Sequence, residues 1–285
     1  MALEIRPLSK VLGAEVIGLD LSRPMDETTF ETIRKAWLDA LVLVFRDLQD
    51  MSVEQHLAFS RRFGRLNADL KAEKTLEGHP EVLVLSTLQK NGAYVGTPGG
   101  GQFWHVDLYF ERIPAMAGFL HAIEVPSDPG VGDTVFANMY AAYEALAEDT
   151  KRRIDGRINR VSRIKSWPIN YPDKPPLTAT QKAAYVDVFH PLVRRHPETG
   201  RKALFIGDVA AGTLEGLPED EGDALLRELR AFAIQPRFVY SHPWRPGDAV
   251  LWDNRCTYHA ATPFDQNRYR RHMHRTTIMD DRVPI

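Results

Sequence analysis

Short strand-like runs set the strongest limit on what this chain can fold into. Each run is four to nine residues long, is rich in β-branched, aromatic or other apolar side chains, and is bounded by turn or polar residues. We expect strands at residues 41–45, 82–85, 117–125, 134–137, 237–240, 249–252 and 276–279. Runs of this kind, recurring along the whole chain, predict a mainly β protein of the α+β class.

A few amphipathic segments predict helices between these strands. Phe30, Ile33, Trp37 and Leu41 recur at steps of three and four, which places them on one face of a helix. Residues 52–55 read Ser-Val-Glu-Gln, a capping box that opens a helix ending near Gly64. Residues 139–154 and a stripe at residues 225–232 predict two more helices. The helices are therefore expected to flank a β core.

Two segments read as irregular and lid-like. Residues 88–101 contain five glycines and one proline among few apolar residues, and four prolines lie between Pro168 and Pro176. We expect lid-like insertions at about residues 67–101 and 163–190. No repeat or linker divides the chain, so residues 1–285 are expected to form one domain.

Charge and hydropathy argue against several classes of partner. The chain has 36 Lys and Arg against 38 Asp and Glu, and its basic residues form no long cluster, so nucleic acid is not expected as a partner. No apolar run approaches the ~20 residues that a membrane helix needs. The N-terminus lacks an apolar signal core, and the single cysteine, Cys256, has no partner for an internal disulfide. We therefore expect a cytoplasmic protein without a membrane partner.

Three residues could together bind a metal ion. His105 and Asp107 lie two apart in a strand-like run at residues 103–110, so their side chains are expected on one face. His259, soon after the expected strand at 249–252, is the candidate third ligand. Two histidines and one carboxylate leave three positions open in non-haem Fe(II) oxygenases. A lone His-x-Asp pattern is more often a hydrogen-bonded pair near a strand end, so both interpretations remain open on spacing alone.

Further motifs follow one another in a recognisable order. They are Trp104-His-x-Asp107, Gly132-Asp-Thr134, Trp252-Asp-Asn-Arg255, His259 and Arg271. With this series the chain resembles the taurine and 2,4-dichlorophenoxyacetate dioxygenase family of Fe(II)- and 2-oxoglutarate-dependent oxygenases, from about residue 5 to residue 280. Residues 204–207 and 215–218 look closer to the phenoxyacetate branch.

This resemblance implies a fold and a set of ligands. The fold would be a double-stranded β-helix, or jelly roll, with flanking helices. The resemblance implies His105, Asp107 and His259 as Fe(II) ligands, with Thr134 and Arg271 holding the far carboxylate of 2-oxoglutarate and O2 as the other co-substrate. A guanidinium suits a carboxylate because it offers two parallel donors. The family also implies a homo-oligomer, either a dimer or a tetramer.

The same resemblance points to residues that contact the prime substrate. Arg275 matches the arginine that binds the acidic group of the substrate in this family. Asp69 stands where the taurine enzyme has a sulfonate-binding histidine, and Gly101 stands where it has an asparagine, which disfavours taurine itself. Trp104 could form part of an apolar wall. The expected substrate is a small organic acid, phenoxyacetate-like or another carboxylate.

The expected reaction is hydroxylation of a C–H bond in that acid, with succinate and CO2 as co-products. One alternative is the same chemistry on a sulfonate, or on an amino-acid or natural-product intermediate whose ammonium group Asp69 could bind. A second alternative, from another class, is a metal-dependent hydrolase or isomerase on a cupin-like barrel. That enzyme would use histidine and aspartate ligands but would not need Thr134 and Arg271 to anchor a dicarboxylate. A third alternative is a non-catalytic binding barrel. Such a protein would tolerate loss of the metal ligands, whereas this chain has all three.

Overall fold

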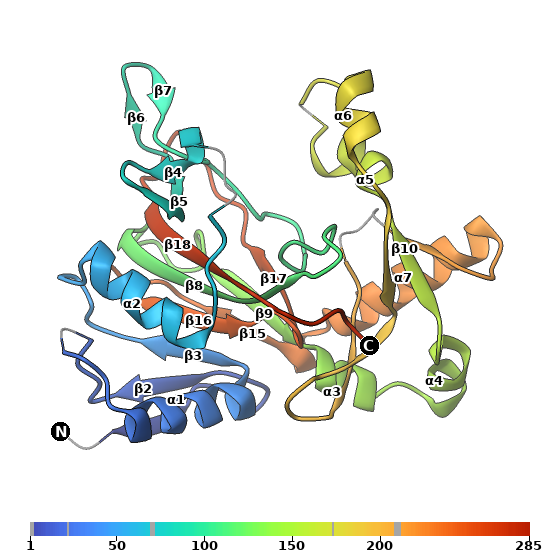
Figure 1. The fold of residues 1–285 in the computed structure, drawn as a ribbon, viewed down its shortest axis with the longest axis horizontal. Coiled ribbons are helices and arrows are strands. Elements are labelled where there is room, and N and C mark those ends of the chain that lie inside the picture. Colours follow the sequence, from blue (N-terminus) through green and yellow to red (C-terminus); the bar gives the residue numbers. More distant parts are fainter. Residues whose placement is uncertain (1–2, 22, 69–71, 173, 208–211) are drawn as a thin grey trace.

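The computed structural model describes residues 3–21, 23–68, 72–172, 174–207 and 212–285, and two β-sheets form its centre (Figure 1). Within these residues the major sheet has eight strands in the order β1-β2-β3-β16-β8-β18-β5-β4, and a minor sheet has the order β15-β9-β17. The major sheet comprises β1 (Glu4–Pro7), β2 (Ala14–Ile17), β3 (Val42–Phe45), β16 (Ala249–Asp253), β8 (Ala115–Glu124), β18 (His272–Met279), β5 (His79–Ser86) and β4 (Thr75–Leu76). The minor sheet comprises β15 (Val239–His242), β9 (Thr134–Asn138) and β17 (Thr257–Ala261).

Strand β3 shows how the major sheet divides the core into two layers. Its four residues are all buried, because both faces of the sheet are covered. Val42 and Val44 face the cluster shared with the minor sheet, whereas Leu43 and Phe45 face the cluster under the first two helices. Strand β16, the antiparallel neighbour of β3, alternates in the same way. The predicted strands at 41–45 and 249–252 are therefore confirmed.

Two helices cover the outer face of the major sheet. They are α1 (Glu27–Ala40) and α2 (Val53–Phe63) (Figure 1). Ile33 and Trp37 of α1 are buried against the sheet, as the apolar stripe predicted. The predicted capping box is present, since Ser52 Oγ accepts from the backbone N–H of Gln55 at 3.2 Å and Gln55 Oε1 accepts from the N–H of Ser52 at 2.7 Å. The helices cover one face of the major sheet and the minor sheet covers the other, which is the layering of the expected jelly roll.

A further group of elements extends the end of the core beside the minor sheet. The helices are α3 (Met139–Glu144), α4 (Glu148–Ile154) and α7 (Glu219–Ala233), and the strands are β10 (Ile158–Val161), β11 (Val188–Pro191), β12 (Val193–Arg195), β13 (Lys202–Leu204) and β14 (Gly212–Leu214), with a 3-10 turn at Pro236–Phe238. Another 3-10 turn, Ala72–Lys74, lies next to β5 of the major sheet. The prediction of one helix over 139–154 is wrong. Ala147 is extended and starts a second helix, so the chain turns between the two parts.

The two expected lid segments are more regular than the sequence suggested. Strand β5 lies inside the 67–101 segment and pairs with β18, so only part of that segment stands apart from the core. The part that projects is the hairpin of β6 (Gln89–Lys90) and β7 (Ala93–Tyr94) (Figure 1). The irregular reading of 163–190 is wrong, because α5 (Arg163–Asn170) and α6 (Ala179–Ala184) form there. Ser162 and Thr178 cap their first turns, and three of the four prolines lie between the helices.

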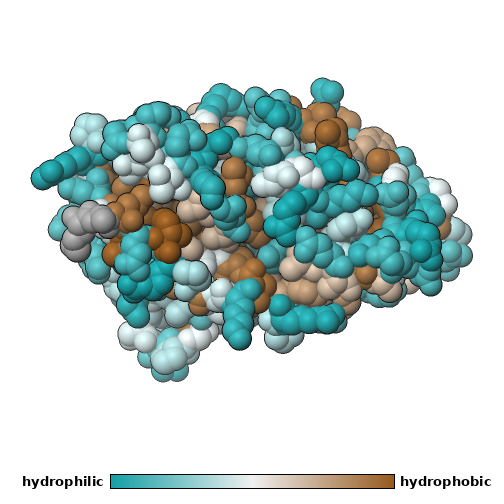
Figure 2. All heavy atoms as spheres, turned by 90° about the horizontal axis from the view of Figure 1, so that it is seen from below, coloured by the Kyte–Doolittle hydropathy of each residue, from teal (hydrophilic) through white to brown (hydrophobic). Residues whose placement is uncertain are grey.

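The surface carries its apolar side chains in small groups. On the face drawn in Figure 2, hydrophobic residues form several separate patches among hydrophilic ones. Among the described residues, no helix is both long enough and apolar enough to cross a membrane. The homo-oligomer expected from the resemblance stays a prediction.

Candidate active site

Two histidines from distant parts of the chain lie side by side. His259 is held in the middle of β17, and the backbone of His105 pairs with it in both directions, with N···O distances of 2.9 and 3.0 Å. The prediction that residues 103–110 form a strand is wrong. This backbone pairing is confined to His105, and Leu108 adopts a left-handed conformation with φ of 53° that turns the chain away. A single bridge is nevertheless enough to bring the two imidazoles together.

Asp107 is positioned chiefly by a side chain, with one longer backbone hydrogen bond of 3.3 Å from Ala115 N–H to its carbonyl. Asn254 Oδ1 accepts from the N–H of Asp107 at 2.8 Å, and Asn254 Nδ2 donates to the carbonyl of Asp107 at 3.0 Å. The same Nδ2 donates to the carbonyl of Ala115 at 2.7 Å, which ties this clamp to the start of β8. Asn254 is fully buried. The sequence reading included Asn254 in a motif but gave it no role, although a buried amide directly after a strand is a usable signal.

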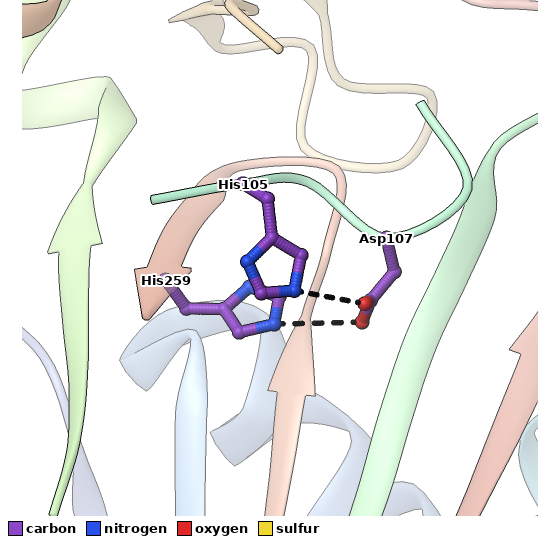
Figure 3. A group of neighbouring side chains, drawn as sticks. All are labelled: His105, Asp107 and His259. Atoms are coloured by element: carbon purple, nitrogen blue, oxygen red, sulfur yellow. Dashed lines mark ion pairs between the residues drawn. The ribbon is translucent and has the colours of Figure 1, made fainter. Parts of the chain in front are cut away.

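His105, Asp107 and His259 point their polar atoms toward one another (Figure 3). His105 Nε2 lies 3.4 Å from Asp107 Oδ1, and His259 Nε2 lies 3.6 Å from Asp107 Oδ2. One ligand atom from each residue can be chosen so that all three lie within 4.8 Å of one another. His105 Nδ1 lies 2.8 Å from the carbonyl of Phe103, so Nδ1 carries the proton and Nε2 offers its lone pair.

The electrostatics of this cluster favour the protonation states that bind metal. Burial, together with the nearby His105, lowers the pKa of His259 well below its usual range. Burial acts to raise the pKa of Asp107, but the charge of the adjacent Arg275 holds this pKa well below its usual value. At neutral pH the cluster therefore presents neutral imidazole and ionised carboxylate, which are the forms that coordinate a metal ion. The three side chains fit a divalent metal.

These side chains open into a cavity of about 680 Å³. Its polar lining includes His105, His259, Thr134, Arg271 and Arg275. Its apolar lining includes Leu83, Leu85, Ile113, Leu120, Trp252 and Met279. This volume lies within the ~300–1,000 Å³ typical of small-molecule sites, and the mixture of apolar walls with a few polar groups is typical of them too.

Arg271 is a buried cation without a counter-ion in the described part of the chain. Its residue is 5% exposed, its Nε has no hydrogen-bond partner, and burial lowers its pKa to about 10. Thr134 lines the same cavity, and its Oγ accepts from Trp244 Nε1 at 3.0 Å. The Thr134 hydroxyl proton is therefore free to donate. A buried guanidinium and a free hydroxyl donor form a site that suits a carboxylate.

Arg275 links the cavity to the candidate metal ligands. Its Nη2 lies 2.6 Å from Asp107 Oδ2, and its guanidinium carbon lies 5.3 Å from the centroid of the Trp252 ring. Its Nε has no hydrogen-bond partner. The side chain also lines the cavity and is 14% exposed, so Arg275 keeps donor capacity there beside its contact with Asp107.

Of the other expected substrate contacts, Gly101, Trp104 and Asp69, only Gly101 lies on the described lining of the cavity. Gly101 lines the cavity with φ of +77°, and a Cβ on it would lie 3.0 Å from His105 Cε1, so no side chain fits there without displacing that ring. Trp104 lies elsewhere: it stacks on Tyr258 with 5.5 Å between ring centroids, packs on the core, and is absent from the described lining. The expectation that Trp104 walls the cavity is therefore wrong. Asp69 lies outside the described residues.

A second polar cluster, His196, Asp253 and Cys256, is also compact but is already satisfied. Arg255 donates to both carboxylate oxygens of Asp253 at 2.8 and 2.7 Å, and His196 Nε2 lies 3.0 Å from Asp253 Oδ2. Burial raises the pKa of the Cys256 thiol well above its usual value, which disfavours the thiolate that a metal needs. This cluster is a buried ion-pair network.

Comparisons with known proteins agree with this geometry. The family model described as "Taurine catabolism dioxygenase TauD, TfdA family" matches residues 4–277. An (S)-phenoxypropionate/alpha-ketoglutarate-dioxygenase of Sphingobium herbicidovorans is 38% identical over 94% of this chain and 92% of its own length. Pentalenolactone F synthase of Streptomyces arenae is 34% identical over 98% of this chain and 96% of its own length.

A solved structure shows the same architecture. AAD-2, crystallised in complex with Mn(II) and N-oxalylglycine, superposes with a TM-score of 0.84 at 32% sequence identity, and the match covers 100% of both chains. The expected jelly-roll core with flanking helices is thereby confirmed.

Proposed function

Because the chain belongs to the taurine catabolism dioxygenase TauD, TfdA family and is a 2-oxoglutarate-dependent dioxygenase, we propose that it hydroxylates a C–H bond of a small organic acid, with succinate and CO2 as co-products. The observation that carries this proposal is the convergence of Arg271 and Arg275 on one cavity with the His105 cluster. Two such arginines match two anions, one for the co-substrate and one for the prime substrate. A metal hydrolase would have no use for the first of them.

We assign His105, Asp107 and His259 as the Fe(II) ligands. Their donor set, two imidazoles and one carboxylate, is the one that leaves three coordination positions open for small molecules. When bound, the iron supplies the activation of O2 that is coupled to decarboxylation of 2-oxoglutarate. Asn254 and the backbone pairing of His105 with His259 hold the ligands in place before the metal arrives.

Arg271 and Thr134 are assigned to the far carboxylate of 2-oxoglutarate. The guanidinium of Arg271 has no acidic partner among the described residues, so a carboxylate placed there would relieve the cost of burying this charge. The Thr134 hydroxyl, whose oxygen already accepts from Trp244, adds a neutral donor. Both residues act by orienting the co-substrate and take no part in bond breaking.

Arg275 is assigned to the acidic group of the prime substrate. Its guanidinium lines the cavity with a side chain that is 14% exposed and can donate to a carboxylate, while Trp252, Leu83 and Leu85 offer apolar walls to the rest of the molecule. This combination favours an acid with an apolar body, in keeping with the phenoxypropionate enzyme among the relatives. The alternative of an ammonium-bearing substrate depended on Asp69, which lies outside the described residues.

The first experiment is an anaerobic titration of the protein with Fe(II) and 2-oxoglutarate. We expect a weak visible charge-transfer band in the wild type and none in His105→Ala. Succinate release is then measured with a panel of phenoxy acids and their neutral amides, for the wild type and Arg275→Gln. Turnover of acids but not amides, lost in Arg275→Gln, supports the proposal. Absence of the band and of 2-oxoglutarate binding in the wild type refutes it.

A further inference from the structure

We propose that the cavity contains a second anion-binding position, formed by Arg163, and that the prime substrate therefore carries two acidic groups separated by an apolar body. The inference rests on the proposed function, since it takes the first acidic group to be the one that Arg275 binds. Arg163 is the first residue of α5 and lines the same cavity as His105 and His259. It comes from a different element from Arg271 and Arg275, which lie at the start of β18 and in β18 itself, and Figure 1 shows α5 apart from β18.

The geometry of Arg163 is that of a prearranged anion receptor. Its guanidinium carbon lies 4.2 Å from the centroid of the Phe110 ring and 4.4 Å from that of Tyr185. Aromatic rings stack on the faces of a guanidinium and leave its in-plane N–H groups free. Arg163 is only partly exposed, and it forms no ion pair with any described acidic residue. Its fork of donors is therefore oriented but unused, which is what bidentate binding of a carboxylate requires.

The charge of the cavity also calls for a second anion. In the loaded site proposed above, the formal charges of iron, Asp107, 2-oxoglutarate, one substrate carboxylate and the two assigned arginines cancel. The described lining holds three further cations, Lys74, Arg112 and Arg163, against one further acid, Glu111. Lys74 and Arg112 are exposed and solvated, whereas Arg163 is held between two rings. Arg163 is thus the cation best placed to select a substrate by charge.

The size and the walls of the cavity suit a molecule with acidic groups at two positions. The volume of about 680 Å³ is large enough for a drug-sized ligand. Apolar side chains from three parts of the fold, Leu85, Ile113 and Trp252, line the same space as the cationic ones. An aromatic or aliphatic body would contact the apolar side chains, and its two carboxylates would contact the cationic ones.

A purely structural role for Arg163 makes a different prediction. By stacking on Phe110 and Tyr185, Arg163 also ties α5 to the loop that follows Asp107. If that were its whole role, its loss would impair all substrates alike. Arg237 offers a matched control, because its guanidinium carbon also lies near two rings, 5.1 Å from Phe232 and 4.7 Å from Phe238, outside the cavity.

The test compares two probes of similar size and shape. 4-Methylphenoxyacetate carries one acid and 4-(carboxymethoxy)benzoate carries two. Succinate release gives kcat/KM for both probes in the wild type, Arg163→Gln and Arg237→Gln. We expect the wild type to prefer the diacid. Arg163→Gln should lower the diacid-to-monoacid ratio by roughly tenfold or more, since a charged hydrogen bond is lost, and Arg237→Gln should leave the ratio unchanged.

Anaerobic calorimetric titration of the protein loaded with Fe(II) and 2-oxoglutarate, so that Arg271 is occupied, gives a binding measurement for both probes that does not depend on turnover. A diacid preference in Kd that disappears in Arg163→Gln supports the inference. Equal losses for the two probes in Arg163→Gln, or no diacid preference in the wild type, overturn it. Failure of the proposed function looks different, because then no probe releases succinate, while the calorimetric preference still reports on Arg163.

Discussion

Replacing Asn254 by alanine tests whether the geometry of the metal centre depends on one amide. The side chain makes three buried hydrogen bonds of 2.8, 3.0 and 2.7 Å, two of them to the backbone of Asp107. A typical hydrogen bond contributes ~1 kcal/mol net, and a buried group left without a partner costs ~1–3 kcal/mol. The N–H of Asp107 would lose its partner, so we expect Asn254→Ala to lower the free energy of unfolding by roughly 3 kcal/mol.

The more specific consequence concerns metal affinity. Without the clamp, the N–H of Asp107 is left unbonded, and the loop is held on either side by the pairing of His105 with His259 and by the Tyr109 hydroxyl, with one bond of 3.3 Å from Ala115 N–H to the Asp107 carbonyl. Loss of residues that orient metal ligands typically costs ~10–100-fold in affinity. We therefore expect Asn254→Ala to weaken Fe(II) binding by roughly tenfold or more, measured by anaerobic titration in conditions where the variant is fully folded.

Asn138 provides the control for this experiment. It is also buried and also makes three hydrogen bonds, to Val11 O at 2.8 Å and from the N–H groups of Tyr140 and Ala141 at 3.1 and 3.0 Å. Asn138→Ala should lose a similar amount of stability in urea unfolding, yet bind Fe(II) like the wild type. If both variants lose stability equally and neither loses metal affinity, then Asn254 is a general structural residue and the reasoning is refuted.

Three further predictions concern single residues. Arg271→Leu should raise the Kd for 2-oxoglutarate by roughly a hundredfold, about 3 kcal/mol, because a bidentate charged contact is lost; unchanged calorimetric binding would contradict this. Gly101→Ala should weaken Fe(II) binding, because the new Cβ meets His105 Cε1 at 3.0 Å; an unaltered titration would show that the ring can move aside. Burial lowers the pKa of His56 to about 3, so its neutral form stabilises the fold fully above the unfolded pKa near 6.5, and this stability is lost as pH falls toward 3. The free energy of unfolding, measured in urea between pH 7 and pH 5, should therefore fall more steeply with decreasing pH for the wild type than for His56→Gln, by up to about 1.4 kcal/mol per pH unit. An equal fall in the two proteins would rule the effect out.

The parts of the fold that the sequence predicted well are those set by local patterns. Residues 42–45 of the predicted run form strand β3, and the Ser52 capping box begins α2, because a short apolar run and a cap depend on neighbouring residues only. The sequence predicts an irregular segment at 163–190 because of its prolines, and this prediction takes no account of the capping residues. In the structure, the hydrogen bonds of Ser162 and Thr178 start short helices in spite of them.

The candidate site could be predicted in its residue types but not in its construction. His105, Asp107 and His259 followed from spacing and motif order, and the structure brings them together. The expected strand around Asp107 failed because its backbone bonds to a side chain 147 residues away, a contact that leaves no periodic trace in the sequence. The prediction that Trp104 lines the cavity failed for a related reason. An aromatic residue beside a ligand can face either the cavity or the core, and in this protein Trp104 packs on Tyr258 in the core.

The metal-binding side of the site is held rigidly, whereas its anion-binding side has a charge that is unpaired among the described residues. The loop after His105 is fixed at several points, by the bridge to His259, by Asn254 and by the Tyr109 hydroxyl, which donates to Phe205 O at 2.9 Å. Across the cavity, Arg271 is buried without an acidic partner among the described residues, which costs folding free energy. The rest of the well-packed core must offset this cost of burying Arg271. A carboxylate bound beside Arg271 would offset this cost, so binding of the anion stabilises the folded state.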